Sequence, residues 1–242
     1  LGLGYVHRPF ESIAHTEGDP AEWVARCERT FALGVGKPLL SDIDLPIVNL
    51  PQFATNHRLW HQPHVVTIGN MFVHCDRNPK IYRRVVAPAD RESVDGPGPL
   101  KIAAHVRRGD VSTNRVSHRF TSNEIVASTL RQVIAEVEKS GRAYEVTVYS
   151  NGDPREFAAL SALGWRVDVN SAALDVFGHL RNADILLAAK STFSYVAALY
   201  SRGIVLYEPF ARRPLPSWIP RDENGGFPAQ RMADLLRDHA LS

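Results

Sequence analysis

Short apolar runs and helical patterns alternate along the second half of the chain. The mostly apolar run 100–106 has the length and content of a buried parallel strand. A helical pattern follows it, with apolar residues recurring every three or four positions up to Gly141. Further strands are predicted at 144–149, 165–169, 185–189 and 204–207, and further helices after 153, around 174–180, at 192–201 and at 228–239. This alternation predicts an α/β fold in which helices cover a parallel sheet.

Two of these helices have capping signals at their starts. Thr121 and Glu124 have the Thr-x-x-Glu spacing of a capping box. Asp153 and Glu156 repeat that spacing, with Pro154 at the first helical position. We therefore expect one helix to begin at each of these places.

The first half of the chain has a similar but less regular pattern. Trp23, Cys27 and Phe31 share one face of a predicted helix, and strands are predicted at 46–50 and 64–68. The two halves meet at a charged and then Pro/Gly-rich stretch without apolar periodicity, which predicts a linker at about residue 95.

The linker divides the chain into two expected domains, residues 1–95 and 96–242. A domain of about 95 residues is small for a complete doubly wound fold. The chain also begins without Met and without a basic signal region. We therefore expect the first domain to be incomplete, with an upstream piece missing.

Composition and charge exclude several classes of protein. The 28 Lys and Arg residues nearly balance the 26 Asp and Glu residues, so the basic surplus typical of a nucleic-acid partner is absent. No apolar run approaches the length of a membrane span. Cys27 and Cys75 make no disulfide framework, and the sequence has no Asn-x-Ser/Thr motif. We therefore expect a cytoplasmic protein with no membrane span.

The string His-Val-Arg-Arg-Gly-Asp, residues 105–110, ends the first strand of the second half. Open α/β sheets bind ligands at such strand ends. Strand alternation places His105 and Arg107 on one face and Arg108 on the other, where Arg108 can pair structurally, for instance with Asp110. The Arg107 guanidinium matches phosphate oxygens bidentately, which predicts an anion site. The alternative is an internal Arg–Asp ion pair that only caps the strand.

A second group of polar residues, Ser191, Thr192 and Ser194, joins a predicted strand to a helix together with Phe193. The positive end of a helix is a natural seat for an anion. The alternative is that Ser191 or Thr192 simply caps the helix. Because both groups follow strands of one sheet, we expect Arg107 and this turn to bind a phosphate or diphosphate from two sides.

These two motifs, about eighty residues apart, resemble those of the fucosyltransferase superfamily, which includes α-1,2-, α-1,6- and protein O-fucosyltransferases. The resemblance covers about residues 100–210. It implies a GT-B fold of two Rossmann-like lobes, with the donor GDP-fucose bound by the C-terminal lobe. It also implies transfer of fucose with inversion, without a metal or other cofactor, to a glycan or another hydroxyl acceptor.

The resemblance also implies roles for individual residues. Arg107 would hold the diphosphate, His105 would lie near the nucleoside, and Thr192, Phe193 and Ser194 would surround the phosphates. An acidic residue before the second motif would read the guanine. Asp175 is the nearest match, although the spacing is longer here, and Asp184 is its competitor.

Inversion also requires a general base near the attacking hydroxyl. Asp110 lies close to the expected donor site, and three more candidates stand near the start of the chain: His7, Glu11 and His15. The sequence does not single out one of them. Two alternatives to a fucosyltransferase therefore stay open, namely a non-catalytic nucleotide-binding or anion-binding module and a transferase that uses another sugar nucleotide.

Two weaker patterns imitate metal sites. Asp42 and Asp44 have the Asp-x-Asp spacing of metal-dependent glycosyltransferases, but they precede Pro46 in a loop. A histidine-rich stretch imitates a zinc site but is interrupted by Pro63 and has no Cys pair; its candidate ligands are His57, His61, His64, His74 and Cys75. We expect neither pattern to hold a metal.

Overall fold

The computed structural model describes residues 98–114, 117–210 and 213–239 of the second half of the chain, and 16–31 with a few short pieces of the first half. The chain divides into two units, Leu1–Ala89 and Asp90–Ser242. Several candidates from the sequence lie outside the described residues: His7, Glu11, His15, His57, His61, His64, His74 and Cys75.

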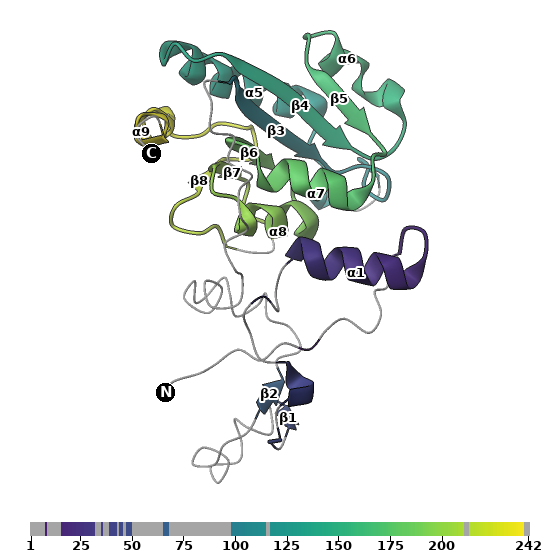
Figure 1. The fold of residues 1–242 in the computed structure, drawn as a ribbon. Coiled ribbons are helices and arrows are strands. Elements are labelled where there is room, and N and C mark those ends of the chain that lie inside the picture. Colours follow the sequence, from purple (N-terminus) through teal and green to yellow (C-terminus); the bar gives the residue numbers. More distant parts are fainter. Residues whose placement is uncertain are drawn as a thin grey trace. The chain divides into compact units, whose positions relative to one another are not determined.

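A six-stranded sheet with all strands parallel forms the centre of the second unit (Figure 1). Its strands are β3 (Leu100–Val106), β4 (Tyr144–Ser150), β5 (Arg166–Val169), β6 (Ile185–Ala188), β7 (Ile204–Tyr207) and β8 (Ile219–Pro220). They lie in the order β5-β4-β3-β6-β7-β8. Counted from the first strand of this unit, the order is 3-2-1-4-5-6, which is the Rossmann arrangement. The predicted α/β fold with a parallel sheet is confirmed.

The central strands β3, β6 and β7 bury both faces, as their apolar runs predict. One face packs against α5 (Asn123–Lys139) and α9 (Ala229–His239) through alternate residues such as Ile102, Ala104 and Leu187. The other face is covered by α7 (Ala173–Arg181) and α8 (Thr192–Tyr200), which lie side by side in Figure 1. The alternation therefore sends His105 and Arg107 toward the side of α7 and α8.

Most element boundaries agree with the sequence pattern, but two helix starts differ. Ser122, not Thr121, is the N-cap of α5, and its Oγ accepts a hydrogen bond from the Ile125 N–H at 3.3 Å. The capping box predicted at Thr121 is therefore wrong by one residue, because Ser caps as well as Thr. Asp153 does cap as predicted, but it begins a 3-10 helix, Pro154–Phe157, before the short α6, Ala158–Ser161.

The first unit contains α1 (Pro20–Phe31) and two short parallel strands, β1 (Ile47–Asn49) and β2 (Val65–Thr67). Asp19 caps α1 by accepting from the N–H groups of Ala21 and Glu22. Within the described residues this unit shows no second Rossmann lobe. In the described part of the chain, no helix combines the length and the hydrophobicity that a membrane crossing requires.

Candidate functional site

The candidate site lies where the chain reverses its direction of travel across the sheet. From β3 the chain adds β4 and β5 on one side, then returns to place β6 on the other side of β3. At such a switch point, the loops after the two central strands separate and leave a crevice at their carboxyl ends. Arg107 follows β3 directly, and Ser191 follows β6 three residues after its end.

Arg107 bridges these two loops. Its Nη1 donates a hydrogen bond to the Ser191 Oγ at 3.0 Å, and its Nη2 forms an ion pair with the Asp110 Oδ2 at 2.6 Å. Gly109, at φ 78°, provides the left-handed backbone that turns Asp110 back toward Arg107. The Arg107 side chain keeps 26% of its surface exposed, so the guanidinium is held in place and still accessible.

Arg108 is structural, but its partners differ from the expected ones. It is buried, and its guanidinium donates to the Arg107 and Thr121 carbonyls and to the Asn123 side chain. It also lies 4.3 Å from the ring centroid of Phe120. The expected Arg108–Asp110 pair is therefore wrong, because Asp110 binds Arg107 and Arg108 points to the opposite face.

The turn after β6 places four predicted residues at the start of α8. Ser191 is fully buried and caps the helix, because its Oγ also accepts from the Phe193 N–H at 3.2 Å. Thr192 is exposed in the first turn. Ser194 is fully buried and donates to the Ala189 carbonyl at 3.1 Å, so its hydroxyl points into the fold. The helix start thus presents Thr192, while Ser194 holds the turn together.

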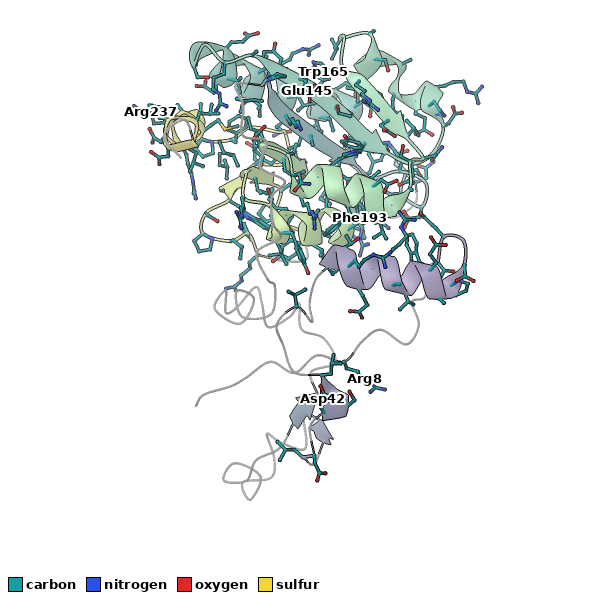
Figure 2. The ribbon with its side chains drawn as sticks, in the orientation of Figure 1. Arg8, Asp42, Glu145, Trp165, Phe193 and Arg237 are labelled. Carbon is teal, nitrogen blue, oxygen red and sulfur yellow. The ribbon has the colours of Figure 1, made fainter. Side chains whose placement is uncertain are left out.

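His105 lies beneath the site and contacts Phe193, which is labelled in Figure 2. The two ring centroids are 5.4 Å apart, and Phe193 packs in turn against Phe177 of α7 at 6.1 Å. His105 is 8% exposed. Burial lowers its pKa to about 4, and the positive charge of Arg107 adds to this effect. The imidazole is therefore neutral at pH 7.

The depressed pKa of His105 predicts a loss of stability in mild acid. The unfolded chain takes up this proton near pH 6.5, but the folded chain takes it up only near pH 4, so stability falls as the pH decreases between these values. The full difference is about 3 kcal/mol. We expect His105→Gln to flatten the pH dependence of the free energy of unfolding between pH 7 and pH 4.5, measured by urea denaturation. The exposed His118→Gln is the control, and equal slopes in both variants would contradict the prediction.

A buried ion network lies beside Arg107 and was not predicted from the sequence. The Glu208 carboxylate, after β7, pairs with the Lys190 Nζ at 2.9 Å and with the Arg221 Nη2 at 2.8 Å. The Arg221 side chain is 2% exposed. Burial lowers the pKa of its guanidinium, and the carboxylates of Glu208 and Asp222 oppose this shift. In the sequence, the one signal for this network is the charged residue Glu208, directly after the apolar run 204–207.

Asp175 and Asp184, the two competing acidic residues, lie at opposite ends of the parallel strands. Asp175 is exposed in the first turn of α7, which follows the carboxyl end of β5. Asp184 precedes β6, where its Oδ2 accepts from the Lys101 N–H at 2.8 Å and its own N–H donates to the Lys101 carbonyl. Asp184 therefore holds the amino ends of β3 and β6 together. Asp175 lies at the carboxyl ends of the strands, as Arg107 does, and is the candidate residue for reading the guanine.

The remaining candidates for a base or a metal ligand are less well placed. The Asp110 carboxylate is engaged with Arg107, and its side chain is half exposed. Asp42 ends a 3-10 helix, Leu40–Asp42, and accepts from the Ser41 hydroxyl at 3.1 Å. In the described residues, no three His, Cys, Asp or Glu side chains gather in the manner of a metal site.

No protein-family model matches this chain, and no curated protein matches it. A function can therefore be inferred from two sources, the switch-point geometry and the resemblance of the two motifs to those of the fucosyltransferase superfamily. The site brings together Arg107, Asp110 and Ser191 by direct contact, with Phe193 and His105 packed beside them.

Proposed function

We propose that the chain is an inverting, metal-independent glycosyltransferase that moves fucose from GDP-fucose to a hydroxyl acceptor. The observation that carries the proposal is the Arg107–Ser191 bridge at the switch point of a parallel sheet. It fixes a guanidinium beside the positive end of a helix, where a diphosphate would meet both. The GT-B architecture is part of the proposal, with residues 96–242 as the donor lobe and residues 1–95 on the acceptor side.

The chemistry follows from the charge that develops when the sugar leaves. Departure of GDP places negative charge on the β-phosphate. A preorganised guanidinium and helix start stabilise that charge more in the transition state than in the ground state. Arg107 has this role in the proposal, and Thr192 contributes the exposed hydroxyl at the helix start. His105 stays neutral and supports Phe193, on which the nucleoside would pack.

One observation favours a second candidate function. The Asp110 carboxylate, the candidate base within the described residues, is paired with Arg107 at 2.6 Å. A site that binds nucleotide without transferring sugar would be compatible with this arrangement. Measuring GDP release from GDP-fucose in the presence of hydroxyl acceptors separates the two functions, because only the transferase releases GDP in an acceptor-dependent way.

The donor base is tested by titrating GDP, UDP and ADP into the protein with excess EDTA, using calorimetry. We expect GDP to bind selectively, and we expect Asp175→Ala to weaken GDP about 10- to 100-fold, because a carboxylate accepts two guanine N–H groups. Pyrophosphate binding should be unchanged in this variant. The exposed Asp238→Ala, on α9, is the matched control.

Two outcomes would contradict this part of the proposal. If Asp175→Ala weakens GDP and pyrophosphate equally, Asp175 does not read the base. If UDP or ADP binds as tightly as GDP, the donor is another sugar nucleotide, because arginine and a helix start recognise a diphosphate whatever base it carries.

A further inference from the structure

A narrow pocket opens beside Arg107 at the carboxyl ends of β3 and β6. Polar side chains from three segments line it, and apolar residues of β3, β6 and α5 close it. The polar lining consists of His105, Arg107, Arg119, Thr121 and Arg221. The pocket has room for about one water-sized group, such as a single phosphoryl oxygen.

Each polar residue of this lining has a buried atom without a hydrogen-bond partner among the described residues. These atoms are the His105 Nδ1, the Arg107 Nε, the Arg119 Nε, the Thr121 Oγ1, and the Nε and Nη1 of Arg221. Buried polar atoms are normally paired, since leaving one unpaired costs about 1–3 kcal/mol. Because these five residues line one pocket, a polar ligand there would give several of their atoms a partner.

The charges of the lining indicate that this ligand is an anion. Arg107, Arg119 and Arg221 line the pocket, and Lys190 lies behind it on Glu208. Glu208 and Asp110 balance two of these four cations. Asp222, the third carboxylate nearby, already accepts hydrogen bonds from the N–H groups of residues 224 and 226. Positive charge therefore exceeds negative charge even when Asp222 is counted.

Arg221 lines the pocket and has donors without a hydrogen-bond partner among the described residues. Glu208 lies 2.8 Å from its Nη2, and Nη1 and Nε have no hydrogen-bond acceptor among the described residues. Thr121 lines the pocket because the neighbouring Ser122 caps α5 in its place. Both features hold polar groups at the pocket without satisfying them.

We propose that this pocket is a second phosphate subsite, in which Arg221 and Arg119 bind one oxygen of the distal phosphate of a nucleoside diphosphate. The assignment rests on the proposed function. Phe193 and α7 lie on one face of the sheet, and Thr121 and Val126, at the start of α5 on the other face, are part of the pocket lining. A nucleotide whose base lies on the side of Phe193 would reach the carboxyl ends of the strands at Arg107 and place its second phosphate between Arg107 and Arg221.

The test compares GDP with GMP, which differ by the distal phosphate alone. We expect Arg221→Met to weaken GDP about 10- to 100-fold and to leave GMP within about twofold, which is the loss of one charge-assisted contact. Arg119→Met should act in the same direction and leaves the Glu208 network intact, so it also serves if Arg221→Met does not fold. Arg202→Met removes the same charge from an exposed position before β7 and should change neither affinity.

The remaining outcomes separate this subsite from the proposed function. Equal weakening of GDP and GMP, or no weakening of either, would overturn the subsite. If no nucleotide binds the unmodified protein, the proposed function fails and inorganic pyrophosphate is titrated instead. Pyrophosphate binding that is lost in Arg119→Met and Arg221→Met would support an anion subsite, and the absence of pyrophosphate binding would overturn it.

Discussion

Replacing Arg107 with alanine is expected to lower the affinity for GDP about 100- to 1000-fold, which corresponds to about 3–4 kcal/mol of binding free energy. The guanidinium links the loops after β3 and β6 through its hydrogen bond to Ser191, and its second hydrogen bond, to Asp110, holds it within its own loop. Alanine removes the fork and its charge together. Calorimetric titration of GDP into both proteins measures the effect.

The same substitution should hardly change stability. The Arg107–Asp110 pair is partly exposed, with side-chain exposures of 26% and 52%, and exposed ion pairs contribute about 0–1 kcal/mol. This separates a ligand role from a capping role. If Arg107 only capped the strand, Arg107→Ala would lower the free energy of unfolding and leave the GDP affinity of the folded protein unchanged.

Two variants complete the comparison. Arg166→Ala removes an arginine whose side chain is 74% exposed, at the amino end of β5, and should leave GDP affinity unchanged. Arg107→Lys keeps the charge but loses the planar fork, so its affinity should fall between those of the alanine variant and the unmodified protein. A lysine variant as weak as the alanine variant would show that geometry, not charge, dominates.

The parallel sheet could be predicted because its central strands are wholly or mostly apolar runs. Leu100–Val106 and Ile204–Tyr207 are bounded by polar or glycine-containing segments, and both strands have the predicted ends. The two-residue strand β8 could not be predicted, since Ile219–Pro220 is too short to show a period. This edge strand forms because it pairs with the backbone of β7.

The sequence predicted those parts of the candidate site that a local sequence pattern determines. Arg107 and Ser191 each follow a strand, so the rule for parallel sheets was sufficient to place them together. The Lys190–Glu208–Arg221 network joins three segments that no local pattern relates. The partner of Asp110 was predicted wrongly because the left-handed turn at Gly109 directs the carboxylate to Arg107.

Glu208→Gln is expected to lower the free energy of unfolding by about 3–5 kcal/mol, the cost of leaving buried charge without its partner. Glu208 is 8% exposed and lies between two cations, Lys190 and Arg221. An amide has no charge to compensate them. Urea denaturation at neutral pH measures the loss, and the exposed Glu145→Gln on β4, labelled in Figure 2, should change stability by less than about 0.5 kcal/mol. A Glu208→Gln loss below about 1 kcal/mol would mean that the network behaves as an exposed pair.

Replacing all three members, as Lys190→Met, Glu208→Leu and Arg221→Met, should restore most of that stability, because apolar side chains of similar size often substitute well for a buried ion network. The same variant should bind GDP about 10- to 100-fold more weakly and GMP about as well as the unmodified protein, because the Arg221 guanidinium is gone from the pocket. This result would show that stability does not require the Lys190–Glu208–Arg221 network, whereas phosphate binding does. The buried charges would then be explained by the anion that they bind.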